Sequence, residues 1–402
     1  MIRKVEINMF SSPENDKKVR IINLILSVTA IVLVVIFAIV VLRDNSTEQK
    51  ELNESIEQAK QEEDKQRQEI FQERKELAEL EKRKETDSFF EKLNDGFDVK
   101  ILVIGDEIGA GEGASDKSKS WIDLLTSKIK NNYNVDVYVK NISMSGNSSY
   151  AGYVRTMVLS DRVQYDLAII CYGQNDENKE FQMYYESIIR AIRKNYDKCS
   201  IISVLESSQI KYTDKMAVIK SLAKHYGIFV ADTIAPFTDG SNGKYESLTD
   251  DKICPNDKGH QIYAETIYEI IDEQVDNSTG YDSTDIEPLS AGVLDFDELM
   301  AINARDFTTE GFNYVYKLDH PITGIVGIDY KYIPNKDGCK IYIDGKEYKL
   351  PEASSKNNAF PLRILLLNDK PIKISDSIEV KFDTQEQSEG FREICISSEK
   401  FD

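Results

Sequence analysis

The chain has fewer basic than acidic side chains and only five cysteines, and both features argue against certain classes of function. Its 50 Lys and Arg residues are outnumbered by 70 Asp and Glu residues, which gives a formal net charge of -20 at pH 7. This balance argues against a nucleic-acid partner, because phosphate binding needs a basic face that releases counterions. The five cysteines are irregularly spaced, so they indicate neither a disulfide framework nor paired C-x-x-C metal sites.

Charge is absent altogether from one stretch, Ile21 to Leu42. A helix of this length spans about 33 Å, enough to cross the hydrocarbon core of a bilayer. A cleaved signal peptide is the alternative, but the run exceeds the roughly 7–15 apolar residues of such a segment, and Arg43-Asp44-Asn45 offers no small-residue cleavage site. Because basic residues concentrate before the stretch, we expect a single-pass protein of the cell membrane, with a cytoplasmic N-terminus and extracytoplasmic C-terminal domains.

The segment after this span is dominated by Glu, Gln, Lys and Arg. Residues 46–88 contain no Gly or Pro, which predicts a long helix that forms a stalk. A heptad pattern can be drawn through Leu52, Ile56, Ala59, Ile70, Leu77 and Leu80, but other positions of the same seam are Glu63, Gln66 and Glu73. A homodimeric coiled coil and a single solvated helix are both compatible with this pattern.

Short β-branched runs then alternate with amphipathic helical segments, which predicts a parallel sheet covered on both faces. The predicted strands are Lys100–Ile104, Asp136–Asn141, Asp166–Cys171, Ser200–Leu205 and Ile228–Ala231. The predicted helices are Trp121–Ile129, Tyr184–Ile192, Met216–Ala223 and His260–Ile271. A chain of 402 residues is too long for one ordinary core, so a second folded domain is expected.

That second domain has a two-residue period. Ile341 to Tyr348 is typical of a hairpin with an Asp344-Gly345 turn. Further strands are expected at Gly324–Tyr332, Leu362–Leu367, Ser377–Phe382 and Phe391–Ile396, which indicates a β-sandwich. The expected organisation is a tail (1–20), a transmembrane helix (21–42), a stalk (43–96), an α/β domain (97–275), a linker (276–289) and a β-sandwich domain (290–402).

Short motifs follow the predicted strands of the α/β domain. Gly105-Asp106-Glu107 ends the first strand, and Asp251-Lys-Ile-Cys254-Pro255 precedes the last helix. Together with Ser143-Met-Ser-Gly146-Asn147 and Gly173-Gln-Asn175-Asp176, they resemble the ordered blocks of the SGNH/GDSL hydrolases. The resemblance covers about 97–275 and implies the SGNH hydrolase fold, with a flavodoxin-like five-stranded parallel sheet.

The resemblance also assigns roles to particular positions. Gly146 and Asn175 correspond to residues of the oxyanion hole, and Asp251 to the acid of the triad. Glu107 stands at the nucleophile position, where the family has serine, and Cys254 stands at the position of the triad histidine. The implied ancestral substrate is an acyl ester, above all an O-acetylated carbohydrate.

Both substitutions oppose the family's reaction. A thiol has a reference pKa of about 8.5, which a nearby carboxylate raises further, so Cys254 is a poor general base. Glu107 is longer than serine and negative, so its carboxylate could lie in the oxyanion hole and accept hydrogen bonds from Asn175 and from the amides of Gly146 and Glu107. An anion there would oppose a tetrahedral oxyanion.

Three interpretations follow. The leading one is a membrane-anchored protein with lost or greatly reduced hydrolysis, retained to bind envelope glycan or to act as a scaffold. The second is an active esterase or carbohydrate deacetylase that uses Glu107 as nucleophile or base. The third assigns the function to the stalk and the β-sandwich. His260 is expected to be structural rather than a replacement base, and no ligand spacing supports a metal or another cofactor.

Overall fold

The computed structural model of the chain describes residues 13–41, 46–159, 163–176, 181–206, 211–242, 244–277, 286–290, 298–331, 339–350, 360, 362–368 and 370–398. These form two compact units, Met1–Thr86 and Asp87–Asp402. Residues 278–285 of the predicted linker and residues 1–12 of the predicted tail lie outside the described residues.

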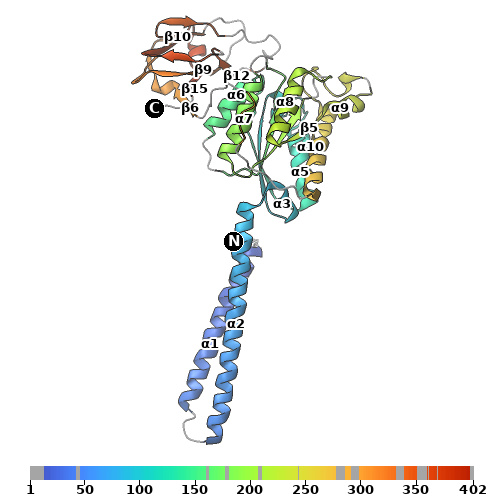
Figure 1. The fold of residues 1–402 in the computed structure, drawn as a ribbon, viewed down its shortest axis with the longest axis vertical. Helices are drawn as coiled ribbons and strands as arrows, with labels where there is room; N and C mark the ends of the chain where they lie inside the picture. Colours follow the sequence, from blue (N-terminus) through green and yellow to red (C-terminus); the bar gives the residue numbers. More distant parts are fainter. Residues whose placement is uncertain are drawn as a thin grey trace, which may run out of the picture. The chain divides into compact units, whose positions relative to one another are not determined.

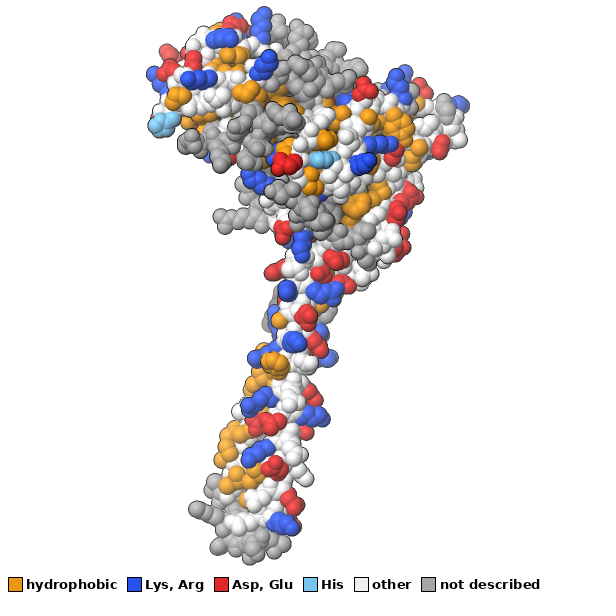
Figure 2. Space-filling model, viewed as in Figure 1, with side chains coloured by type: hydrophobic (Ala, Val, Ile, Leu, Met, Phe, Trp, Pro, Cys, Tyr) orange, Lys and Arg blue, Asp and Glu red, His pale blue; other side chains and the backbone are white. Residues whose placement is uncertain are grey.

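The first unit consists of two helices, α1 (Pro13–Val41) and α2 (Ser46–Thr86), which contact one another. Lys17–Ile39 within α1 is long and apolar enough to cross a membrane. Along α2, acidic and basic side chains are mixed, as Figure 2 shows, and Arg67 forms an i,i+4 ion pair with Glu63. The long helix predicted over 46–88 is present as α2.

The second unit begins with α3 (Phe89–Asn94), which belongs to the α/β domain and not to the stalk. Ser88 caps it: its hydroxyl accepts from the amide of Glu91, and the Glu91 carboxylate accepts from the amide of Ser88. Phe89, Phe90 and Leu93 are buried in the same core as the first strand. These three apolar side chains are thus part of the globular core.

A five-stranded parallel sheet has the order β2-β1-β3-β4-β5, which confirms the flavodoxin-like topology. Its strands are β1 (Val99–Gly105), β2 (Val137–Asn141), β3 (Leu167–Cys171), β4 (Ser200–Leu205) and β5 (Phe229–Asp232). The central strands β3 and β4 are buried along their whole length, as expected of strands covered on both faces. Each predicted strand is present to within a residue or two.

Helices cover both faces of this sheet (Figure 1). One core cluster joins the sheet to α6 (Ser149–Val158), α7 (Phe181–Asn195) and α8 (Asp214–Tyr226). The other joins it to α3, α5 (Trp121–Tyr133), α9 (Ile234–Gly240) and α10 (Asp257–Asn277). A short helix, α4 (Glu107–Ala110), follows β1 directly.

The C-terminal part forms two antiparallel sheets around a core of their own. Their orders are β11-β10-β14-β8-β7 and β12-β9-β15-β6, and β13 also pairs with β9. The elements are β6 (Glu298–Asn303), β7 (Thr308–Glu310), β8 (Asn313–Lys317), β9 (Ile322–Lys331), β10 (Cys339–Ile343), β11 (Lys346–Tyr348), β12 (Leu362–Leu366), β13 (Ile372–Ile374), β14 (Ser377–Phe382), α11 (Gln385–Ser388) and β15 (Phe391–Ser398). Asp344 and Gly345 form the hairpin turn, both with positive φ.

This β domain packs on α6. Ile325, Ile364 and Cys395 belong to the same core cluster as the helices of the α/β domain. A Cβ on Gly327 would lie 2.0 Å from the Tyr150 hydroxyl of α6, so only glycine allows that approach. The two domains of this unit are therefore joined by a buried apolar contact, while the β domain keeps a core of its own.

Candidate functional site

Glu107 begins α4 at the carboxyl end of β1. A Cβ on Gly105 would lie 2.7 Å from the Cys171 carbonyl oxygen and 2.8 Å from Gly109 Cα, so glycine lets the chain turn tightly from strand to helix. Asp106 caps the helix, accepting a hydrogen bond from the amide of Ile108. The Glu107 side chain is 0 % exposed. The strand, turn and helix thus place a fully buried carboxylate at the carboxyl end of β1.

The Glu107 carboxylate is held by the two predicted donors. Its Oε2 atom accepts from the Gly146 amide at 2.8 Å and from Asn175 Nδ2 at 2.7 Å. Gly146 has a φ of 76°, a conformation that favours glycine. The amide of Glu107, which was also expected to donate, is not among the donors to this carboxylate in the described residues. Oε1 accepts no hydrogen bond within the same part of the chain.

The β domain supports this donor pair, which the sequence analysis did not foresee. Arg363 is buried, and its Nη1 donates to the Gly146 carbonyl oxygen at 3.3 Å. Asn147 Oδ1 accepts from the amide of Ile364 at 2.8 Å, and the Asn147 carbonyl oxygen accepts from Asn175 Nδ2 at 3.2 Å. Strand β12 therefore fixes the loop that presents Gly146.

Asp251 and Cys254 lie together in the loop before α10. Asp251 Oδ1 accepts from the amides of Ile253 at 2.8 Å and Cys254 at 2.7 Å. Burial alone would raise the pKa of Asp251, but these hydrogen bonds lower it. Burial, followed by the charges of Asp251 and Glu107, raises the pKa of the Cys254 thiol far above its usual value. Cys254 is only 4 % exposed and remains a neutral thiol at physiological pH, so it is no general base.

Both ring nitrogens of His260 form hydrogen bonds to the backbone. Its Nδ1 accepts from the Trp121 amide at 3.2 Å, so its Nε2 carries the proton and donates to the Glu112 carbonyl oxygen at 3.0 Å. Burial lowers its pKa, which is consistent with a neutral ring. His260 therefore ties α10 to α5 and to the loop after α4, and does not replace the missing base.

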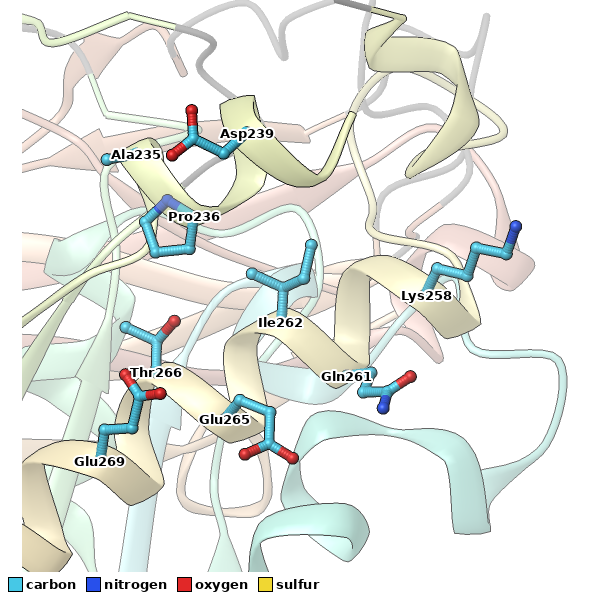
Figure 3. Close-up of a pocket in the computed structure, with 9 residues that line it drawn as sticks. All are labelled: Ala235, Pro236, Asp239, Lys258, Gln261, Ile262, Glu265, Thr266 and Glu269. Carbon is cyan, nitrogen blue, oxygen red and sulfur yellow. The ribbon is translucent and has the colours of Figure 1, made fainter. Parts of the chain in front are cut away.

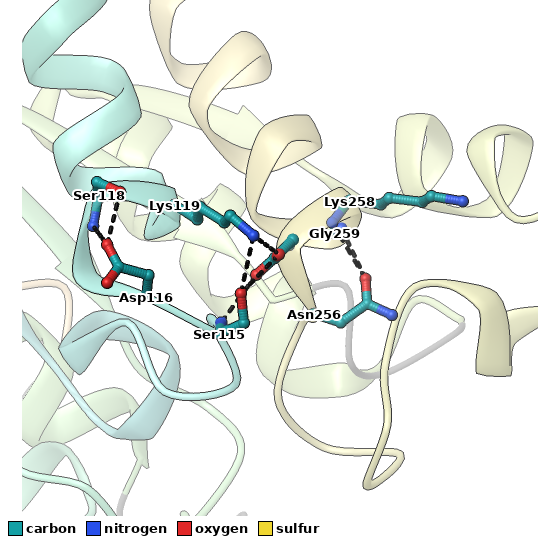
Figure 4. Close-up of polar contacts among 8 residues, drawn as sticks. Ser115, Asp116, Ser118, Lys119, Asn256, Lys258 and Gly259 are labelled. Carbon is teal, nitrogen blue, oxygen red and sulfur yellow. Dashed lines mark hydrogen bonds and ion pairs between the residues drawn. The ribbon is translucent and has the colours of Figure 1, made fainter.

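A polar network beside His260 holds the same loop to α10 (Figure 4). The Asp257 carboxylate accepts from the amide and hydroxyl of Ser115, each at 2.8 Å, and from Lys119 Nζ at 2.7 Å. The hydrogen bond from Lys119 is the largest of the causes that lower the pKa of Asp257 to about 2. This exposed network fastens the segment that follows Glu107.

More buried carboxyl groups surround Glu107 than the motifs indicated. Glu206 follows β4 and is 2 % exposed, and Asp106 is 0 % exposed. Asp176 accepts from the amide and hydroxyl of Ser149, and burial raises its pKa to about 6. Glu206 was missed because it lies in no family motif, although its position directly after a buried strand was a usable signal. Among the described residues, no group of three or more such side chains has the arrangement of a metal site.

A groove on another part of the domain lies between α9 and α10. Figure 3 shows its lining, in which the side chains of Asp239, Ile262, Glu265 and Glu269 project from the two helices. Glu265 is already paired with Lys128 of α5. None of the residues at the strand ends line this groove, so it is separate from the Glu107 site.

The strand order and the helices on both faces define a doubly wound α/β domain. Residues 103–262 match the model of the GDSL-like Lipase/Acylhydrolase family, so the chain contains a GDSL-like lipase/acylhydrolase domain. No curated protein matches the chain.

Solved structures agree on the architecture. One is a two-domain esterase active on acetylated mannans, with a TM-score of 0.63 and 16% identity over 78% of this chain and 94% of that chain. The same kind of esterase co-crystallised with mannopentaose gives a TM-score of 0.61 and 16% identity over 77% of this chain and 94% of that chain. At this identity the likeness establishes the two-domain fold and not the activity.

Proposed function

We propose that this protein is a membrane-anchored, extracytoplasmic GDSL-fold protein whose hydrolysis is lost or greatly reduced, and that it binds envelope glycan or acts as a scaffold. One observation carries the proposal: Glu107 Oε2 lies 2.8 Å from the Gly146 amide and 2.7 Å from Asn175 Nδ2. These are the donors that an oxyanion would need, and a buried carboxylate already uses them.

The reacting groups support the same conclusion. Acyl transfer by this fold needs a hydroxyl activated by a base, and the Cys254 thiol is buried with its pKa raised. The imidazole of His260 has both nitrogens engaged. Triad loss typically leaves only the roughly 10³–10⁴-fold acceleration from the oxyanion hole and binding. Here the hole is occupied as well.

The partner and the location belong to the same proposal. The two-domain esterase with the similar fold acts on acetylated mannans, which supports an acylated glycan as the partner of this chain. We place residues 1–20 in the cytoplasm, one span at 21–42 and the remainder outside, with the stalk available for homodimerisation. The candidate span in α1 supports the anchor, and the basic residues before it support the orientation.

The test compares the purified full chain in detergent with its Glu107→Ala variant on an aryl acetate. We expect equal, near-background turnover, because neither protein has a nucleophile and base. A wild-type rate clearly above that of Glu107→Ala would overturn the proposal. Binding is measured separately, with acetylated and deacetylated mannan oligosaccharides.

A second function is favoured by the free oxygen of Glu107. Oε1 has no hydrogen-bond partner among the described residues. In this case the substrate carbonyl displaces Oε2 from Gly146 and Asn175, which then polarise it, while the Glu107 carboxylate attacks the acyl carbon with loss of the alcohol, or activates water. In that case the turnover has a bell-shaped pH profile that is abolished in Glu107→Gln. A flat profile at background rate would exclude it.

A further inference from the structure

Two buried acids lie on either side of Cys171, close to Glu107. Asp106 is 0 % and Glu206 2 % exposed. The amide of Asp106 donates to the Cys171 carbonyl oxygen at 3.1 Å, and Glu206 Oε1 lies 4.0 Å from Cys171 Sγ. Two ionised carboxylates buried this close would repel one another, whereas a proton lets one carboxyl donate to the other.

The surroundings offer these acids little other compensation. Asp106 Oδ2 and Glu206 Oε2 receive no hydrogen bond from an amide, hydroxyl or ammonium group among the described residues. Gly173 has a φ of 145°, and a Cβ there would lie 3.5 Å from Glu206 Oε2. This glycine therefore lies in van der Waals contact with the carboxyl.

Burial and neighbouring charge both disfavour ionisation of the pair. Burial is the main cause that raises the pKa of Asp106, and the charges of Glu206 and Glu107 add to it. Burial likewise raises the pKa of Glu206 to about 8. Lys215 lowers the pKa of Glu206, but its Nζ donates to the carbonyl oxygens of Gly173 and Asp176. The other titratable groups that act on the pair are Glu107, Cys171, Tyr172, Asp176, Tyr185 and Cys254.

We propose that Asp106 and Glu206 are positioning residues that share one proton and thereby keep the Glu107 carboxylate seated against Gly146 and Asn175. With the proton in place, the cluster avoids placing charge on all three neighbouring carboxyls. When the proton is lost, the repulsion is relieved by opening the site and moving Glu107 away from its donors. The inference concerns the geometry of the site and holds whether or not hydrolysis remains.

The direction of the pH effect follows from linkage. The closed site holds a proton that the open, hydrated site releases, so a rise in pH favours opening. The window runs from the usual carboxyl range, about 4.5, up to the raised value of about 8 for Glu206. Within it, the opening equilibrium rises about tenfold per pH unit for one linked proton, and above it the dependence levels off.

Hydrogen exchange of the full chain in detergent tests this, with the Gly146 amide as the probe because it donates to Glu107. Between pH 5.5 and 7.5, the protection factor of this amide, corrected for the intrinsic exchange rate, should fall about tenfold per pH unit and then level off above about pH 8. In Glu206→Gln the proton is no longer shared, so the corrected protection should become independent of pH. Asp106→Asn should behave in the same way and serves if the first variant folds poorly.

Glu186→Gln is the matched control. Glu186 is equally buried in the same domain, but its carboxylate accepts from Tyr226, Leu289 and Ser290, so its substitution removes no shared proton. This variant should keep the wild-type pH course at Gly146. A wild-type protection factor that is constant across the range, or a Glu206→Gln variant that follows the wild type, would overturn the proposal. Neither result would bear on the aryl acetate test, so the two proposals can fail separately.

Discussion

Glu186 and Glu206 are both buried glutamates of the α/β domain, yet their surroundings are opposite. Glu186 accepts four hydrogen bonds, from the Tyr226 hydroxyl, the amides of Leu289 and Ser290, and the Ser290 hydroxyl. Glu206 lies near another acid, Asp106, and its Oε2 atom accepts no hydrogen bond from an amide, hydroxyl or ammonium group of the described residues. A buried carboxylate with several hydrogen-bond donors, such as Glu186, stabilises the fold. Buried acids at strand ends that lack donors, such as Glu206, are typical of functional sites.

The largest expected effect comes from placing the family's serine and histidine at positions 107 and 254. The double variant Glu107→Ser with Cys254→His should raise aryl acetate turnover by about three orders of magnitude, because it supplies the nucleophile and base while Gly146 and Asn175 become free to bind an oxyanion. Steady-state kinetics measure it, with Cys254→His alone as the control. If the double variant folds and still shows background turnover, the hole or the acyl pocket is not intact.

Glu186→Ala should lower the unfolding free energy by about 3–5 kcal/mol, because it leaves several buried donors without an acceptor. The chain has one tryptophan, Trp121, which is buried in the α/β core. Urea unfolding followed by its fluorescence therefore measures this domain. Glu186→Gln keeps one acceptor oxygen and should lose roughly half as much. A loss below about 1 kcal/mol for the alanine variant would contradict the structural role.

Glu107→Gln should increase the unfolding free energy, in contrast to the Glu186 variants. The amide oxygen still accepts from Gly146 and Asn175, while a charge that acts on Asp106 and Glu206 is removed. At pH 8 we expect a gain of about 1 kcal/mol, and at pH 5 a smaller one, since the pair is then protonated. The same Trp121 assay at both pH values measures it. Destabilisation as large as that of Glu186→Gln would place Glu107 among the structural residues.

The smallest effect concerns Cys254. The charge of Asp251 is one of the causes that raise the thiol pKa, so Asp251→Asn should increase alkylation of Cys254 severalfold at pH 8 while its Oδ1 can still accept from the loop amides. Mass spectrometry of the alkylated peptides measures the rate, with Cys339 of the β domain as the internal reference. An unchanged ratio would show that burial alone protects Cys254.

The sequence predicted the sheet well because buried parallel strands carry an unmistakable apolar signal. The same motifs predicted that the Glu107 carboxylate would meet Gly146 and Asn175. Helix α6 was missed because seven of its ten residues are buried, which removes the one-sided periodicity of a surface helix. Among the β-domain strands, β7 is exposed along its whole length, so it has no apolar face. β13 alternates between buried and exposed residues but has only three of them, which is too short a signal.

The acid pair was beyond sequence reasoning for a different reason. Asp106 follows β1 and Glu206 follows β4, and their proximity depends on the order of the strands. The same is true of Arg363, which lies 217 residues from Gly146 along the chain. Contacts of this kind come from tertiary packing and leave no local pattern.

The attachment of β12 to the loop of Gly146 and Asn147 determines which piece of the chain can be studied. Ending the chain at residue 277 would strip Arg363 from the Gly146 carbonyl and uncover the Tyr150 side of α6. The α/β domain expressed alone would then have a less constrained Gly146 loop and an exposed apolar surface that favours aggregation. The lack of esterase activity in such a fragment would therefore not show that the intact protein is inactive.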